Sequence, residues 1–335
     1  MTGLLTRASP QTLRLLALGL ALLATILFFA TQIEGYLSPR MFTRISTSAA
    51  VVLPIAVGQA IVIMTRNIDL SAGSILGVVA YMTGQLLGTM PDLHPVLAVL
   101  FCMALGGAFG ALNGLIIAWG RVPSIIVTLG TLALYRSFLV EWSDAKTITT
   151  ASLPQWLVDL PSATAFSIGG FDIRVTVLLA LAACLVTGLA LTFFRPARRF
   201  YAVGSNPDAA VMAGINAKRV VLSAFILSGA FAGLSGFLFL AKFGNITVVA
   251  GLGFELKSIA AVVVGGVSIM GGSGSMIGVL MGALLVDTID NSLTRWAVVS
   301  EFWRDALLGG LIMAAVTLDT LASRQLTRLR KGGQK

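Results

Sequence analysis

The sequence predicts an all-α protein, a polytopic transmembrane helix bundle of about ten spans. Of its 335 residues, 57% are hydrophobic and only 11% are charged, whereas about a quarter of the residues in soluble domains are charged. Apolar runs long enough to cross about 30 Å of hydrocarbon recur along the whole chain. Because the segments between these runs are short, we expect residues 1–335 to form a single transmembrane domain.

Each expected span follows from a window of high hydropathy. Unpaired backbone groups are costly at membrane depth, so every span should be helical. The eighth window is short and interrupted by glycines. In order, the spans are expected near 13–31, 46–66, 73–90, 96–118, 123–142, 173–194, 220–241, 257–270, 276–293 and 303–321.

The distribution of basic residues predicts the orientation of the chain. An even number of spans puts both termini on one side, and with that side in the cytoplasm the inside segments hold 14 of the 23 Lys and Arg residues. The segment 143–172 then lies in the periplasm, while the basic segment 195–219 and the tail 322–335 lie in the cytoplasm. The net charge of +9 therefore reports topology, and no nucleic-acid partner is expected.

Glycines recur at a spacing of four in two of the expected spans. One set is Gly106, Gly110 and Gly114, and the other is Gly274, Gly278 and Gly282. This spacing puts each set on one helix face, where a neighbouring helix can approach closely. The two sets lie in opposite halves of the chain, so spans two to five and spans seven to ten are candidates for an inverted repeat.

The stretch from Arg66 to Ser74 places polar residues between two apolar runs. A charge at membrane depth costs about 2.5 to 3.5 kcal/mol, so Asp69 needs compensation. One interpretation is a helix break in which Ser71 and Ser74 cap the next helix and Asp69 lies at its positive end. The other is a break that borders the solute pathway, because irregular backbone at this depth needs protein or a water-filled cavity beside it.

The stretch from Gly204 to Ile215 predicts a short helix outside the membrane. Asn206 is a typical N-cap and Pro207 a typical first residue, and Gly214 ends the helix after about two turns. Its residues are small and apolar, which favours docking to another protein over a solvated loop. The residues assigned to this docking role are Gly204, Asn206, Pro207, Ala209, Ala210, Ala213 and Gly214.

The remaining polar residues of the spans argue against an enzyme. Glu255 and Lys257 are expected to be neutralised by each other or by neighbouring spans, and Lys257-Ser258 lacks the glycine spacing of a phosphate loop. Asp287, Asp290 and Asn291 suit polar lining or interhelical hydrogen bonds better than paired-acid catalysis. The cysteines, Cys102 and Cys184, lie singly in apolar runs, so no metal site and no cofactor are expected.

With these residues in view, the chain resembles the permease subunits of bacterial ABC importers for ribose, arabinose, xylose, rhamnose and autoinducer-2. The resemblance covers nearly the whole chain. Lys257, where many sugar permeases carry an acid, together with Tyr135-Arg136 and Phe302 to Asp305, is closest to the autoinducer-2 and rhamnose branch. The matching stretches are Asn67 to Ser74, Asn113-Gly114, Pro123 to Thr131, Gly204 to Ile215 and Ile259 to Gly274.

The resemblance implies the partners and the mechanism. Two permeases, identical or paralogous, would pair in the bacterial inner membrane, two ATPase subunits would dock at 204–215, and a periplasmic binding protein would deliver a monosaccharide-like solute. ATP hydrolysis would occur on the ATPase, so this chain is not expected to be an enzyme. The candidates for lining the solute path are Asn67, Asp69, Ser71, Asn113, Asp287 and Asn291.

An ion-coupled secondary transporter is the alternative function. Buried acids such as Asp69 would then carry protons, and no ATPase would be needed. Whether 204–215 binds an ATPase distinguishes the two hypotheses. An intramembrane enzyme would need an acid, base or metal constellation that the sequence does not offer.

Overall fold

The all-α class is confirmed by a computed structural model that describes residues 10–296 and seven isolated positions between 303 and 317. The expected tenth span at 303–321 and the tail therefore lie almost entirely outside the described residues. The elements are α1 (Pro10–Gln32), α2 (Pro39–Met64), α3 (Ala72–Thr89), α4 (Pro95–Gly120), α5 (Ser124–Ser143), η1 (Thr150–Ser152), α6 (Gln155–Asp159), η2 (Leu160–Ser162), β1 (Thr164–Ile168), β2 (Phe171–Arg174), α7 (Val175–Phe193), α8 (Arg195–Ser205), α9 (Pro207–Met212), α10 (Ala217–Phe243), α11 (Phe254–Val264) and α12 (Met276–Trp296).

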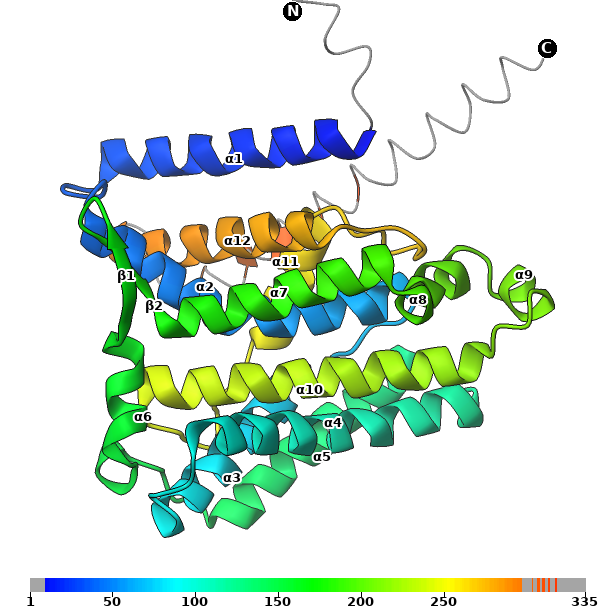
Figure 1. The fold of residues 1–335 in the computed structure, drawn as a ribbon, viewed down its shortest axis with the longest axis horizontal. Helices are drawn as coiled ribbons and strands as arrows, with labels where there is room; N and C mark the ends of the chain where they lie inside the picture. The colour runs from blue at the N-terminus through cyan, green and yellow to red at the C-terminus, as the bar shows by residue number, and fades with distance from the viewer. Residues whose placement is uncertain are drawn as a thin grey trace, which may run out of the picture.

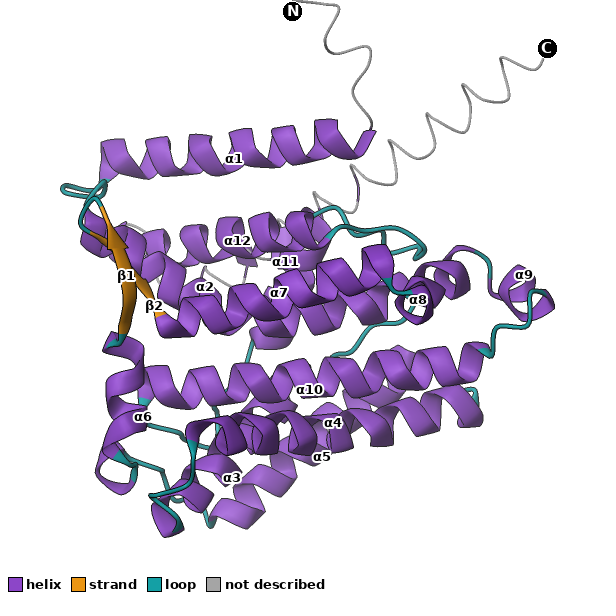
Figure 2. Ribbon diagram, viewed as in Figure 1, coloured by secondary structure: helices purple, strands orange, loops and turns teal. Residues whose placement is uncertain are grey.

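The long helices lie side by side, and the connections gather at the two ends of the bundle (Figures 1 and 2). One end carries α6 and the hairpin β1–β2, and the other carries α8 and α9. Helix α1 begins at the end of the bundle that carries α8 and α9. The segments 143–172 and 195–219 thus lie at opposite ends, which is the relative placement that the predicted topology requires.

Seven of the described helices are long and apolar enough to cross a membrane, namely α1 from Arg14 onward, α2, α4, α5, α7, α10 and α12. Helix α3, of 18 residues, and helix α11, of 11 residues, are not among them. The expected spans at 73–90 and 257–270 are therefore not among these seven, and the one at 257–270 is wrong because α11 ends at Val264. At 1.5 Å per residue α11 is about 16 Å long, and the glycines Gly266, Gly271 and Gly272, all at positive φ, keep the chain after it non-helical.

Helices α3 and α11 each follow a non-helical segment, which we call the first break (residues 65–71) and the second break (residues 244–253). The second break and the start of α11 pack against the first turns of α3, directly after the first break. A Cβ atom on Gly73 would overlap the Glu255 carboxylate, and one on Gly77 would overlap the Ala250 carbonyl oxygen. The helices before the breaks, α2 and α10, run in opposite directions (Figure 1). This arrangement supports the predicted inverted repeat, whose last span lies outside the described residues.

Both sets of spaced glycines are close helix contacts. On α4, a Cβ at Gly106 would overlap the Gly229 carbonyl oxygen of α10, and one at Gly110 would overlap that of Phe225. On α12, Gly278 and Gly282 approach the backbone of α11 equally closely. The expected role in helix packing is confirmed for these glycines, whereas Gly274 lies before the start of α12. The partner helices of the two sets are not equivalent in a repeat.

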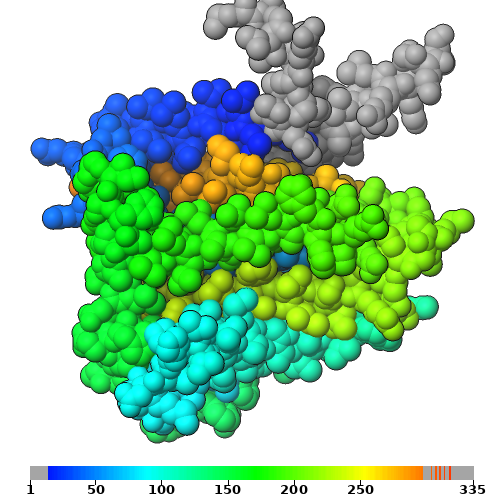
Figure 3. Space-filling model, in the orientation of Figure 1, coloured from blue at the N-terminus to red at the C-terminus, as the bar shows by residue number. Residues whose placement is uncertain are grey.

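Burial divides the helices into central and peripheral ones. Helix α2 is buried along most of its length and packs against α7, α10, α11 and α12. Helix α1 lies at the edge, where it covers α12 (Figure 3). Its side chains Leu16, Leu20 and Leu23 are exposed, as expected for a helix that faces lipid.

At the end opposite α8 and α9, a short hairpin closes the bundle. Strands β1 and β2 pair antiparallel across a turn at Gly169 and Gly170, both at positive φ, which glycine adopts readily. Ile148 and Ile246 exchange two backbone hydrogen bonds of 3.0 Å. This bridge ties the segment 143–172 to the second break.

Candidate functional site

The first break is organised around the carboxylate of Asp69. Its Oδ1 atom accepts hydrogen bonds from the backbone N–H of Ser71 at 3.0 Å and the Ser71 hydroxyl at 2.7 Å. Its Oδ2 atom accepts from the hydroxyl of Ser228 on α10 at 3.0 Å. With its amide oriented to satisfy both groups, Gln59 of α2 pairs with the backbone N–H and C=O of Asp69. The buried carboxylate therefore has the hydrogen-bond partners that its burial requires.

Two further helices extend this cluster. Asn113 of α4 donates to the Ser71 hydroxyl at 2.7 Å, and Tyr135 of α5 donates to the Asn113 side-chain oxygen at 3.2 Å. Asp69, Ser71 and Asn113 are each 0% exposed. Three predicted lining residues thus meet in one buried cluster, and a solute would reach them only if the surrounding helices separated.

The start of α3 is capped differently from the expectation. Ser71 is the N-cap residue, but its side chain makes no capping hydrogen bond, because its hydroxyl donates to Asp69. Ser74 donates instead to the Leu132 carbonyl oxygen of α5. The Asp69 carboxylate alone takes the capping role, by accepting from the Ser71 N–H group.

The second break is followed by an ion-pair cluster between α11 and α12. The Nζ atom of Lys257 lies 2.7 Å from a carboxylate oxygen of Asp287 and 2.7 Å from one of Asp290. Asn291 donates to the other oxygen of Asp287 at 2.8 Å, and Ser48 of α2 donates at 3.2 Å to the oxygen that Lys257 contacts. The side chain of Asp287 is fully buried, and those of Lys257 and Asp290 are 10% and 12% exposed.

The ion pairs of this cluster show which residues neutralise the charge of Lys257. Of the two expectations, neutralisation by a neighbouring span is the one observed. Glu255 accepts from the N–H group of Gly253 at 3.1 Å. Asp287 and Asn291, two of the predicted lining residues, lie here beside Asp290, which was expected to serve as polar lining or in interhelical hydrogen bonds but was not among the solute-path candidates.

Arg136 of α5 is a further charged residue at membrane depth. Its contribution to the site was not predicted from the sequence. Its guanidinium donates to the Val248 carbonyl oxygen at 3.0 Å and to the Ala250 carbonyl oxygen at 2.6 Å. Arg136 therefore braces the second break. A cation in the middle of the apolar run 123–142 was the signal that could have identified it.

Asn67 lies apart from the other five lining candidates. Its amide donates to the Thr65 carbonyl oxygen at 2.9 Å, and the residue borders a cavity of about 360 Å³ together with Arg121, Ser124 and Lys218. This cavity lies between the first break, the α4–α5 turn and the start of α10. Asn67 is thus at a surface opening, whereas the Asp69 cluster is inside the bundle.

The predicted docking helix is α9. Asn206 accepts from the backbone N–H of Ala209 at 3.0 Å, Pro207 is the first helical residue, and Gly214 has a φ of 79°, so the predicted cap, first residue and stop are all present. Val211 and Met212 are 58% and 89% exposed.

Ala210 faces the other way from the rest of α9. It is 4% exposed, within the core of this chain. Among the assigned docking residues, Ala209, Ala213 and Gly214 are exposed, and Gly204 is buried at the end of α8. A partner would therefore contact the face of α9 that carries Val211 and Met212. A larger side chain at Ala210 would instead disturb the packing of α9 against the rest of its own chain.

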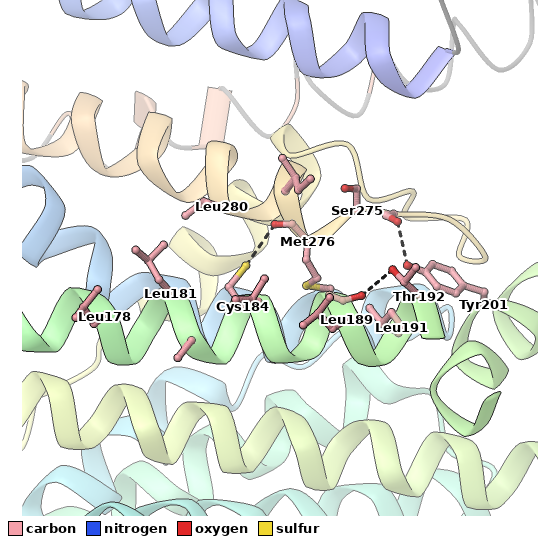
Figure 4. A pocket seen from close by; sticks show the side chains of 15 residues that line it. Leu178, Leu181, Cys184, Leu189, Leu191, Thr192, Tyr201, Ser275, Met276 and Leu280 are labelled. Atoms are coloured by element: carbon pink, nitrogen blue, oxygen red, sulfur yellow. Dashed lines mark hydrogen bonds between the residues drawn. The ribbon is translucent and has the colours of Figure 1, made fainter. Parts of the chain in front are cut away.

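A cavity of about 870 Å³ lies between α7 and the start of α12 (Figure 4). Its walls are mostly aliphatic, with Leu178, Leu181 and Leu185 from α7 and Ile277 and Leu280 from α12. Such a lining suits hydrocarbon chains rather than a hydroxylated solute.

The cysteines pack as expected. Cys102 lies 3.1 Å from the Thr83 hydroxyl, and Cys184 donates to the Met276 carbonyl oxygen, and both are buried. Within the described residues, no cluster of His, Cys, Asp and Glu side chains could hold a metal ion.

A bundle of apolar helices with two internal breaks and buried polar clusters is the architecture of a membrane permease. The chain belongs to the family described as branched-chain amino acid transport system / permease component, whose model matches residues 41–316. This membership confirms the predicted class, the permease subunit of an ABC importer. A permease subunit is not itself catalytic.

The chain is similar to the autoinducer 2 import system permease protein LsrC of several enterobacteria. It is 37% identical to that of Escherichia coli O9:H4 over 302 residues, which are 89% of this chain and 85% of the relative. The protein from Salmonella typhi is 36% identical over 300 residues, 90% of this chain and 84% of the relative. The predicted resemblance to the autoinducer-2 branch is thereby confirmed. No solved structure matches the chain.

Proposed function

We propose that this chain forms half of the translocation path for autoinducer-2 or a related sugar-like solute across the bacterial inner membrane. The observation that carries the proposal is the 37% identity with an autoinducer 2 import permease over 89% of the chain. The Lys257 cluster fits such a solute chemically. Carboxylates accept hydrogen bonds from neighbouring hydroxyl groups, and an ammonium group donates to hydroxyl oxygens.

In this proposal the chain pairs with a second permease, a periplasmic binding protein delivers the solute, and ATPase subunits supply the work. The exposed face of α9 is the ATPase-docking surface. A helix of six residues is too short to be stable alone, and its apolar side chains Val211 and Met212 need a partner. Family membership decides against the ion-coupled secondary transporter.

A charge on α9 tests the docking role. Met212→Asp places a carboxylate in an apolar contact, so the purified permease should lose its ATPase and transport should fall to background. Met90→Asp is the matched control, because Met90 is also exposed, at 57%, but lies at the opposite end of the bundle. The measurements are co-purification with the ATPase and uptake into vesicles that contain the whole transporter.

Two results would count against the proposal. If Met212→Asp retains the ATPase and transports like Met90→Asp, α9 is not the docking surface. If vesicles with the wild-type permease take up ribose in preference to autoinducer-2 and rhamnose, the assigned solute class is wrong.

A further inference from the structure

Three chain segments meet where α8 ends, and we call this contact the α2–α8 joint. It consists of Met64 and Arg66 after α2, Gly204 and Ser205 at the end of α8, and Gly272 in the segment before α12. The Nε atom of Arg66 donates to the Gly204 carbonyl oxygen at 2.5 Å, and its Nη2 atom donates to the Ser205 carbonyl oxygen at 2.7 Å. These carbonyl groups belong to the last turn of α8, where they lack helical partners and where a cation is favoured.

The backbones of the joint touch without side chains between them. A Cβ atom on Gly204 would overlap the Met64 carbonyl oxygen and lie 2.6 Å from the Gly272 nitrogen. The Gly272 N–H group donates to the Met64 carbonyl oxygen at 3.0 Å. Contacts this close leave no free space, so a displacement of one segment displaces the others.

A second tie connects α8 with the segment before α12. The Tyr201 hydroxyl donates to the Gly274 carbonyl oxygen at 3.0 Å (Figure 4). Burial raises the pKa of the Tyr201 phenol, so it remains protonated and keeps this hydrogen bond. Helix α8 is thus fixed to α2 through Arg66 and to the start of α12 through Tyr201 and Gly272.

The joint lies directly between the docking surface and the two polar clusters. On one side, Ser205 is followed by Asn206, the cap of α9. On the other, Arg66 is followed within three residues by Asp69. Helix α12, which begins four residues after Gly272, carries Asp287 and Asp290. Arg66 itself holds a left-handed conformation, with φ of 64°, which is uncommon for a residue other than glycine.

We propose that Arg66 is a positioning residue that couples α9 to the helix breaks. The α2–α8 joint moves as one unit, so a displacement of α9 by the ATPase shifts the end of α2 with the first break, and the start of α12 with the acids that hold Lys257. The inference rests on the proposed function of α9 and goes beyond it, because it assigns the route by which docking reaches the membrane.

The test uses the whole transporter in vesicles, with Arg66→Ala and Arg66→Lys as variants. Arg121→Ala is the matched control. Arg121 also follows a helix on the α9 side of the bundle, has a positive φ, of 56°, and is exposed like Arg66. Its side chain, however, makes no hydrogen bond or ion pair among residues 10–296. The backbone effect of alanine is therefore the same in both, and only the hydrogen bonds to α8 differ.

Arg66→Ala should keep the ATPase in the purified complex, because the exposed face of α9 is unchanged. Uptake should fall about ten-fold, a typical size for coupling between two sites, and solute-loaded binding protein should no longer stimulate ATP hydrolysis. Arg66→Lys, which keeps the charge but not the two-pronged donor, should fall between Arg66→Ala and the wild type. Arg121→Ala should match the wild type in both measurements.

Three outcomes would overturn the proposal. Uptake and stimulation of Arg66→Ala equal to those of Arg121→Ala would show that Arg66 does not couple. Loss of the ATPase from the Arg66→Ala complex would assign the residue to docking. Failure of both Arg66→Ala and Arg66→Lys to fold would make it a structural cap of α8. Failure of the proposed function would look different, since the wild-type permease itself would then not retain the ATPase.

Discussion

Charged residues at membrane depth are each satisfied by a different kind of partner. Asp69 accepts hydrogen bonds from hydroxyl and backbone groups, Arg136 donates to backbone carbonyls, and Lys257 pairs with two carboxylates. All three lie at or next to a break in a helix. For Asp69 and Arg136, the breaks supply backbone groups that a continuous helix would use internally, and these two charges satisfy those groups in return.

Asp69 offers a direct test of this exchange. Asp69→Leu leaves the Ser71 N–H, the Ser71 hydroxyl and the Ser228 hydroxyl without their acceptor, and each buried unpaired group costs about 1 to 3 kcal/mol. The temperature of thermal unfolding in detergent and the rate of uptake should both fall. Asp69→Asn, which keeps one acceptor oxygen and nearly the same volume, should lose less on both counts. A normally inserted Asp69→Leu protein with wild-type unfolding and uptake would remove Asp69 from the site.

At this scale the sequence identified polar residues but not their pairings. Asp69, Ser71 and Asn113 could be singled out because polar groups in apolar runs are costly, yet nothing in the sequence aligns α4 with the first break. Lys257 has potential partners in Glu255 and in every neighbouring span, and only the packing of α11 on α12 selects Asp287 and Asp290. Arg66 was counted as a charge that orients the chain, because its partners are backbone carbonyls, which carry no sequence signal.

At the scale of elements, hydropathy located the long helices and failed where glycine interrupts an apolar run. The prediction at 257–270 averaged apolar residues over a stretch in which Gly265 and Gly266 end α11. The stretch from Arg66 to Ser74 was predicted correctly as a break, because its polar residues are consecutive. The hairpin β1–β2 was not predicted, since the five residues of β1 are all exposed and give no apolar alternation.

The α4–α10 contact predicts opposite effects for two similar substitutions. Gly110→Ala would push a methyl group into the Phe225 carbonyl oxygen of α10, and forcing the helices apart costs about 1 to 3 kcal/mol. Gly130→Ala, on α5, has nothing within 4 Å of the new methyl group and should stabilise the helix by up to about 1 kcal/mol.

Thermal unfolding of the purified variants measures the difference. Gly110→Ala should unfold at a lower temperature than the wild type, and Gly130→Ala at the same or a higher one. Equal unfolding temperatures for the two variants would mean that α4 and α10 do not pack as closely as described.

At the scale of the whole molecule, composition and the order of apolar runs were sufficient to predict a membrane bundle. The packing of the second break against the start of α3 was not predicted, because hydropathy along a chain contains no information on which spans are neighbours. The glycines at a spacing of four were the one sequence pattern used here that indicated contacts between spans. They showed which helix faces make close contact, but not that one set faces α10 and the other α11.

The orientation of the bundle is open to labelling from outside sealed cells. Both native cysteines are buried, so single new cysteines report their own positions. Ser152→Cys, in the segment 143–172, should react with a membrane-impermeant maleimide. Ala213→Cys, beside α9, should react only after the cells are opened, because the excess of basic residues predicts that this end lies in the cytoplasm. The reverse pattern would invert the topology and remove α9 from the reach of a cytoplasmic ATPase.

The short helix α11 bears on how the chain is inserted during synthesis. With 11 residues it spans about half of the hydrocarbon layer, and it carries Lys257, whose cost at the membrane centre is about 2.5 to 3.5 kcal/mol. Its compensating acids, Asp287 and Asp290, leave the ribosome 30 and 33 residues later. Release of α11 into lipid as an independent span is therefore unfavourable, and we expect the stretch from Phe254 to Trp296 to leave the translocon as a hairpin whose charges are already paired.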